Sequence, residues 1–137
     1  MTSTPTDFRG RLKRVKGLGA AHHGVSHWWL QRVTAVAMIP LSVWFVWSLV
    51  TVLSAPNVVK VAEWFSSSVN AVLMVALLGA AFAHAKLGLQ VVIEDYVKGH
   101  GAKFCLLLAN VFICYLFAAV SILAVLKLHF LDIAATV

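Results

Sequence analysis

Charged side chains are scarce in this chain. Asp, Glu, Lys and Arg together make up 12% of its 137 residues, and only five residues are acidic. Hydrophobic residues make up 61%, and the mean hydropathy is +0.91. A water-soluble domain could not remove so much apolar surface from water. The composition therefore excludes an ordinary soluble protein and predicts an integral membrane protein that folds as one bundle.

The motifs of soluble enzymes are also missing. The sequence contains no glycine-rich phosphate loop, nucleophile elbow, HExxH motif or flavin fingerprint. Its two cysteines, Cys105 and Cys114, are nine residues apart, which places them on opposite faces of one helix and prevents a disulfide between them. No cysteine spacing typical of a metal site occurs. If the protein works in redox chemistry, it must receive electrons from a partner.

Three hydrophobic runs are long enough to cross a bilayer, for which about 20 residues suffice. They cover approximately residues 30–53, 64–94 and 104–126. All three are expected to be helices, because irregular backbone is not tolerated against lipid. We therefore predict an all-α membrane protein with a basic N-terminal segment, residues 1–29, and a three-helix transmembrane domain, residues 30–137.

The basic residues are unevenly distributed. Five of the eleven precede the first run: Arg9, Arg11, Lys13, Arg14 and Lys16. With the N-terminus inside, Arg32, Lys98 and Lys103 lie on the same side, and only Lys60 and Lys127 lie outside. An excess of Lys and Arg marks the cytoplasmic face. We expect a cytoplasmic N-terminus and a periplasmic C-terminus in a bacterial inner membrane, which the short leader favours over a mitochondrial one, and no nucleic-acid binding.

The second run contains an ionisable imidazole, His84, at a depth where polar groups are costly and usually functional. Neutral imidazole can ligate a haem iron. Ala80 and Gly88, one turn before and after His84, provide the small surface that a porphyrin against a helix requires. The alternative is an interhelical hydrogen bond within close helix packing. No other histidine lies in a run, so a second haem ligand would have to come from another subunit.

An acid and a phenol, Asp95 and Tyr96, directly follow the same run, where its helix should meet water. Eleven residues bring Asp95 back to the His84 face of a helix, about 16 Å away along its axis. A tyrosine hydroxyl can donate to a quinone carbonyl, and a nearby acid can relay protons. The alternative is an interfacial anchor beside a solvated acid.

Two cations lie in or near the runs. Arg32 could pair in bidentate fashion with a buried carboxylate such as a haem propionate, or it could bind lipid phosphate. Lys86 is rotated about 200° from His84 and is therefore not expected in the same site. It is interpreted as a snorkelling or cavity-facing lysine.

Two segments closely resemble the small hydrophobic anchor, or D subunit, of succinate dehydrogenase (respiratory complex II). They are HWWLQRVTAVAMIPL at residues 27–41 and HAKLGLQVVIEDYVKG at residues 84–99, in which Asp-Tyr-Val begins eleven positions after a histidine. The resemblance covers approximately residues 26–126. It implies half of a six-helix anchor bundle, completed by a cytochrome b anchor subunit. The bundle would dock an iron–sulfur subunit, which docks a flavoprotein subunit.

The resemblance also implies a function in succinate:ubiquinone oxidoreductase, between the tricarboxylic acid cycle and the respiratory chain. Electrons from succinate would pass through FAD and iron–sulfur clusters, held by partner subunits, to ubiquinone. His84 would be an axial ligand of one haem b shared with the other anchor. Tyr96, Asp95 and Arg32 would form part of the quinone site, and Arg32 would also lie near the haem propionates.

Three other interpretations stay open. The chain could be a purely structural anchor without haem contact, or the anchor of a quinol:fumarate reductase, which would use similar parts. It could also be a small transporter with Lys86, Glu94 and Asp95 as a relay. Few charges lie in the runs and no broken-helix signal is present, which argues against transport.

Overall fold

The computed structural model describes residues 22–54 and 57–135, and its ordered elements there are all helices. They are α2 (His22–Leu53), α3 (Val58–Ser66), α4 (Ser68–Tyr96) and α5 (His100–Ala135). Three of them are long and apolar enough to cross a membrane, over Val25–Leu53, Ser68–Tyr96 and His100–Phe130. The predicted all-α class with three spanning helices is thus confirmed. The five basic residues before the first run lie outside the described residues.

The helix bounds differ from the predicted runs at two places. α2 begins at His22, eight residues before the apolar run that starts at Leu30, so part of the N-terminal segment is helical. The predicted second run began near Trp64, but that residue belongs to the separate helix α3. Ser67, between α3 and α4, has extended backbone with φ −66° and ψ 116°. Three consecutive serines, Ser66, Ser67 and Ser68, interrupt the apolar pattern at this break, although the predicted run was extended across them.

Side-chain hydrogen bonds stabilise both ends of α3. At its start, the Asn57 side chain accepts a hydrogen bond from the Val59 backbone N–H at 3.1 Å, as a helix N-cap does. At its end, the Asn70 amide donates to the Trp64 carbonyl at 2.9 Å, so α4 satisfies a carbonyl that the last turn of a helix leaves free. Asn57 before α3 and Asn70 in the first turn of α4 therefore hold the two ends of this short helix.

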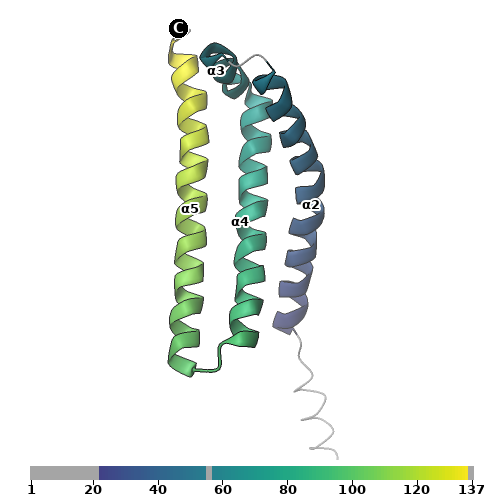
Figure 1. Ribbon diagram of the computed structural model, residues 1–137, viewed down its shortest axis with the longest axis vertical. Coiled ribbons are helices and arrows are strands. Elements are labelled where there is room, and N and C mark those ends of the chain that lie inside the picture. The colour runs from purple at the N-terminus through teal and green to yellow at the C-terminus, as the bar shows by residue number, and fades with distance from the viewer. Residues whose placement is uncertain (1–21, 55–56, 136–137) are drawn as a thin grey trace, which may run out of the picture.

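The three long helices lie side by side in a single row, with α4 in the middle (Figure 1). α4 contacts both α2 and α5, whereas the described parts of α2 and α5 do not contact each other. α2 is bowed, and it contains Pro40, which cannot donate a backbone hydrogen bond to the preceding turn. The fold is therefore an open layer with two broad faces rather than a closed three-helix bundle.

α3 lies across one end of this row, near the C-terminal end of α5 (Figure 1). Trp64 of α3 stacks on Trp44 of α2, with ring centroids 5.7 Å apart. On the other side, Nδ1 of the buried His129 on α5 lies 2.9 Å from the Phe65 carbonyl oxygen. α3 thus links the two outer helices, which do not meet directly.

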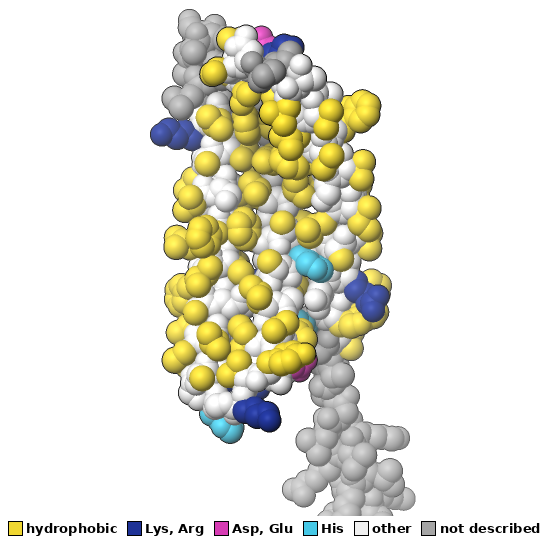
Figure 2. Space-filling model, viewed as in Figure 1, with side chains coloured by type: hydrophobic (Ala, Val, Ile, Leu, Met, Phe, Trp, Pro, Cys, Tyr) yellow, Lys and Arg dark blue, Asp and Glu magenta, His cyan; other side chains and the backbone are white. Residues whose placement is uncertain are grey.

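Apolar side chains cover the visible face over most of its height (Figure 2). Of the described side chains none is fully buried, and the buried apolar set is small: Ala71, Leu87, Cys114 and Val125. Many large apolar residues along all three spanning helices are exposed. Exposed apolar area on this scale is what lipid and a partner subunit cover in a membrane protein.

The seam between α4 and α5 contains a buried polar residue, Asn110, which is 7% exposed. Its amide nitrogen donates to the Lys86 carbonyl at 2.9 Å, and its amide oxygen accepts from the Cys114 thiol at 3.4 Å. Interhelical hydrogen bonds in membranes contribute about 0.6 kcal/mol on average and up to about 1.7 kcal/mol. The Asn110 amide is therefore expected to make a small but measurable contribution to the stability of this seam.

We expect Asn110→Ala to lower the free energy of unfolding by about 1 kcal/mol, because the substitution removes both contacts. Detergent-induced unfolding of the protein in bicelles measures this change. Leu108→Ala, which truncates an exposed side chain on the same helix, is the control. Equal stabilities for the two variants would contradict a stabilising function of Asn110.

Candidate functional site

His84 contacts α2 through one of its two ring nitrogens. Nδ1 lies 3.2 Å from the backbone carbonyl oxygen of Gln31 and 3.2 Å from the Thr34 hydroxyl oxygen. Thr34 is 8% exposed, and its hydroxyl also lies 2.8 Å from the Leu30 carbonyl oxygen. Two residues that are one turn apart on α2 therefore hold a histidine in the middle of α4.

These contacts determine the tautomer of His84. A carbonyl oxygen can only accept a hydrogen bond, so Nδ1 must carry the proton that is shared with Gln31. The Thr34 hydroxyl donates to a carbonyl of its own helix and can accept from the same Nδ1–H. In neutral imidazole the lone pair is then on Nε2, which has no hydrogen-bond partner within the described ranges. This arrangement, in which a carbonyl orients one nitrogen and leaves the other free, is typical of histidines that bind metals.

Small residues lie one turn on either side of His84, as the sequence predicted. Ala80 and Gly88 are both half-buried. A Cβ placed on Gly88 would meet the Gln31 side-chain nitrogen at 3.9 Å, an ordinary contact distance. Alanine would therefore fit there, and a large side chain would press against α2. Because neither position carries a large side chain, space is left beside the His84 ring.

A second imidazole, that of His27, lies one turn before Gln31 on α2. Its Nε2 is buried and lacks a hydrogen-bond partner among the residues described. Buried polar atoms are nearly always satisfied, by protein, water or a bound group. Since α2 runs antiparallel to α4, His27 lies between the level of His84 and the end of α4 that carries Asp95. The described residues therefore leave one buried polar atom of α2 without a partner at this level.

Asp95 and Tyr96 lie at the very end of α4, as expected. Both are exposed, and the Tyr96 side chain is 81% exposed. The neighbouring Glu94 is engaged locally, since its carboxylate accepts from the Gln90 amide at 2.9 Å and its carbonyl accepts from the Lys103 ammonium at 2.6 Å. Asp95 and Tyr96 are therefore the polar groups of this helix end that are available to another molecule.

Arg32 is exposed, and its guanidinium carbon lies 4.4 Å from the centroid of the Trp28 ring. This cation–π contact directs the guanidinium along the outside of α2. In the chain alone, no contact joins Arg32 to His84, Asp95 or Tyr96. The structure thus brings His84 against α2 but leaves the other predicted site residues as separate groups on one half of the layer.

Sequence reasoning missed the two α2 residues that orient His84. The hydroxyl of Thr34 and the carbonyl of Gln31 both lie in the segment of residues 27–41, which was singled out for its pattern as a whole. The only available signal was a polar residue, Thr34, among apolar neighbours in a spanning helix. Every residue has a backbone carbonyl, so the sequence could not show that the carbonyl of Gln31 contacts His84.

Comparison with known proteins gives a consistent result. The family model of the succinate dehydrogenase/fumarate reductase transmembrane subunit matches residues 6–120. The succinate dehydrogenase hydrophobic membrane anchor subunit of Rickettsia conorii is 33% identical over 119 residues, which are 86% of this chain and 90% of that protein. Its counterpart in Rickettsia bellii is 32% identical over 104 residues, 75% of this chain and 82% of that protein.

A more distant relative, the succinate dehydrogenase hydrophobic membrane anchor subunit of Paracoccus denitrificans, is 27% identical over 100 residues, 73% of this chain and 77% of that protein. No solved structure gives a significant match. The family match covers all three long helices except the end of the last one. The chain therefore belongs to the family of succinate dehydrogenase/fumarate reductase transmembrane subunits, and it has the spanning helices of a membrane anchor.

Proposed function

We propose that this chain anchors a succinate:ubiquinone oxidoreductase in the bacterial inner membrane, co-ligates haem b through His84 and contributes to the ubiquinone site. The observation that carries the proposal is the hydrogen bond from His84 Nδ1 to the Gln31 carbonyl, which leaves Nε2 free at the depth of the bilayer. The relatives that match over most of their length are named as succinate dehydrogenase anchors. Both observations support a redox anchor over a structural anchor without cofactor.

The residues around His84 fit a haem. Nε2 offers a lone pair to the iron, and Ala80 and Gly88 leave room for a flat ring system beside α4. The exposed guanidinium of Arg32 is a donor on α2 toward which a propionate group could be directed. When bound, haem supplies one-electron storage between the iron–sulfur clusters and the quinone. The chain itself orients the imidazole, and His84 Nε2 would hold the iron together with a ligand from another subunit.

The end of α4 fits the reduction of a lipid-borne quinone. The Tyr96 hydroxyl can donate a hydrogen bond to a quinone carbonyl oxygen, and the exposed Asp95 carboxylate can pass protons from water. Arg32 supplies a fixed positive charge on the same half of the layer, where negative charge develops on the quinone. The reaction needs apolar access for the tail and aqueous access for protons, and a helix end at the membrane surface provides both.

The remaining members of the proposed complex follow from the open layer and from the relatives. A cytochrome b anchor subunit would cover the face with the free His84 nitrogen and supply the second haem ligand. An iron–sulfur subunit and a flavoprotein subunit would carry the clusters and FAD. By the positive-inside rule, they would dock on the cytoplasmic side, where Lys98 and Lys103 lie, while the C-terminus is periplasmic.

The test is an optical spectrum of the affinity-purified assembly. Dithionite-reduced minus oxidised absorbance is expected to show a b-type signal in preparations that contain the partner subunits, with about one haem per copy of this chain. Succinate-dependent ubiquinone reduction should be present in the same sample. An assembly that reduces ubiquinone without any b-type signal would instead favour the anchor that passes electrons directly from cluster to quinone.

A further inference from the structure

The middle of α4 has a second ionisable residue, Lys86, which the proposed redox function does not use. Lys86 is rotated about 200° from His84 and contacts α5 instead of α2. Its ammonium donates to the Tyr115 hydroxyl oxygen at 3.3 Å and lies 5.0 Å from the centroid of the same ring. An ammonium has three donors, and among the described residues no acidic side chain and no second acceptor contacts this one. The described part of the chain thus leaves the positive charge of Lys86 uncompensated.

Lys86 lies deep in the bilayer. The midpoint of α4, which runs over Ser68–Tyr96, is Phe82, so Lys86 is four residues, about 6 Å of helix, from the middle. With a hydrocarbon core about 30 Å thick, this position is about 9 Å inside the nearer boundary. A lipid headgroup at the membrane surface is therefore too far away to pair with the ammonium. Charged residues at such depth are costly, and they are usually paired inside an assembly.

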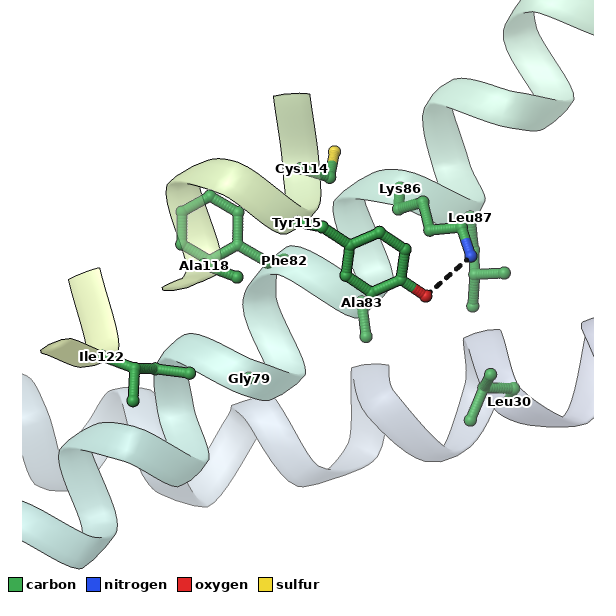
Figure 3. A pocket seen from close by; sticks show the side chains of 10 residues that line it. All are labelled: Leu30, Gly79, Phe82, Ala83, Lys86, Leu87, Cys114, Tyr115, Ala118 and Ile122. Carbon is green, nitrogen blue, oxygen red and sulfur yellow. Dashed lines mark hydrogen bonds between the residues drawn. The ribbon is translucent and has the colours of Figure 1, made fainter. Parts of the chain in front are cut away.

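A groove of about 290 Å³ lies beside Lys86 and crosses the middle of the membrane (Figure 3). Lys86 and Tyr115 are at one end of it, and Gly79 and Ile122 are at the other. Gly79 is three residues, about 4.5 Å, beyond the midpoint of α4. Apart from the Lys86 ammonium and the Tyr115 hydroxyl, the side chains that line the groove are apolar.

Small residues make this groove suitable for a helix. Gly79 and Ala83 are one turn apart on α4, and Ala118 of α5 lines the same groove. Small residues at this spacing allow a neighbouring helix to approach closely in a membrane. A Cβ on Gly79 would have nothing within 4 Å, so the space in front of α4 is open at this level. The groove can therefore receive side chains of a helix that crosses the bilayer beside α4 and α5.

We propose that this groove docks a transmembrane helix of another subunit, and that an aspartate or glutamate near the middle of that helix pairs with Lys86. The carboxylate accepts hydrogen bonds from the ammonium and supplies the missing negative charge at the depth where no headgroup can. The Tyr115 hydroxyl holds the ammonium at the end of the groove. The Asn110 amide, which donates to the Lys86 carbonyl, holds this part of α4 against α5. Because Lys86 and His84 point in different directions, this docking surface does not depend on a bound haem.

A second copy of this chain cannot provide the carboxylate. The sequence has five acidic residues, and none lies near the middle of a spanning helix: Asp7, Glu63, Glu94, Asp95 and Asp132. The one closest to Lys86 along α4 is Glu94, eight residues or about 12 Å away. Neighbouring copies have the same orientation in the membrane, so their carboxylates lie at the wrong depth. The partner is therefore a different chain.

Replacement of Lys86 distinguishes a paired lysine from one that faces lipid. The assembled complex is purified in a mild detergent, a harsher detergent is titrated in, and native mass spectrometry follows the subunits that stay bound. Lys86→Met is expected to bind one membrane subunit about tenfold more weakly, because removal of the lysine leaves a carboxylate uncompensated within the bilayer. Lys86→Arg should retain that subunit. Lys127→Met, which removes an exposed lysine near the C-terminal end of α5, is the matched control and should retain it too.

Gly79→Leu is a second, independent variant, because it fills the groove and leaves Lys86 in place. It should weaken binding of the same subunit, whereas Gly79→Ala should not, and the open space at Gly79 allows both variants to fold. A lysine that faces only lipid predicts a different result for Lys86→Met. Methionine is less costly than lysine in hydrocarbon, and no partner would lose its counter-charge, so every subunit would stay bound.

Photo-crosslinking then identifies the occupant of the groove. A diazirine-bearing aliphatic residue replaces Ile122, and the adduct formed in the assembled complex is located by mass spectrometry of its peptides. The expected adduct is on an apolar spanning segment of the subunit that Lys86→Met releases, with an acidic residue about two turns from the adduct, since seven residues separate Gly79 from Lys86 along α4. An adduct on lipid alone, or on a segment without an acidic residue, would overturn the proposal. Equal binding of every subunit by Lys86→Met and Lys127→Met would overturn it as well.

Discussion

Replacement of His84 by alanine is expected to remove the b-type absorbance of the assembled complex, with at least a tenfold loss of bound haem. The reason is geometric: the Gln31 carbonyl and the Thr34 hydroxyl hold Nδ1, so Nε2 is the nitrogen that can reach an iron. Loss of outer partners of metal ligands already costs about 10- to 100-fold in affinity, and loss of the ligand itself should cost more. The measurement is the reduced-minus-oxidised spectrum, normalised to the partner subunits present.

His129→Ala is the matched control for this experiment. Like His84, His129 lies in a long helix and directs Nδ1 at a backbone carbonyl, that of Phe65, but it does so at the opposite end of the layer. It should keep the haem, although it loses a contact between α3 and α5. A His84→Ala complex that retains full haem absorbance would mean that the iron is held elsewhere. His84 would then be a packing residue that joins α2 and α4.

Replacement of Tyr96 by phenylalanine is expected to lower succinate-dependent ubiquinone reduction about tenfold or more. The substitution removes only the hydroxyl, and an unsatisfied quinone carbonyl in a desolvated site costs about 1–3 kcal/mol. Succinate oxidation with a water-soluble artificial electron acceptor should be unchanged, because that reaction does not use the quinone site. The haem spectrum should also stay as in wild type.

The chain offers a matched control here as well, since it contains only two tyrosines. Tyr115→Phe removes the same atom from α5, at a position that is 60% exposed and engaged with Lys86. It should leave ubiquinone reduction intact. If Tyr96→Phe and Tyr115→Phe behave alike, Tyr96 does not donate to the quinone, and Asp95 or a partner residue must be sought as the donor.

The features of the fold that depend on hydrophobicity alone could be predicted from the sequence. A run of about 20 apolar residues can satisfy its backbone in lipid only as a helix, so three spanning helices followed directly. The break at Ser67 was not predicted, although Ser66, Ser67 and Ser68 interrupt the apolar pattern there, because the apolar residues Trp64 and Phe65 were assigned to the same run. The row arrangement was also not predictable, since it depends on which helix faces meet, and all faces of these helices are apolar.

The candidate site was predictable to the extent that it depends on rotation along one helix. His84, with Ala80 and Gly88, could be placed on one face of α4 by counting residues. The orientation of the imidazole depends on α2, through Thr34 and a backbone carbonyl, and no count along α4 can reveal it. The same applies to Lys86: its rotation away from His84 followed from spacing, whereas its contact with Tyr115 required the structure.

The flat row of α2, α4 and α5 also bears on the biogenesis of this protein. A newly inserted copy has no enclosed core, because no described side chain is fully buried, so its helices gain little from one another before a partner arrives. Surplus copies should therefore be short-lived substrates for membrane proteases. An open face also gives a flat cofactor sideways access until a second subunit covers it. The timing of synthesis of the proposed second anchor subunit would then determine both the lifetime of this chain and the moment at which the proposed haem is enclosed.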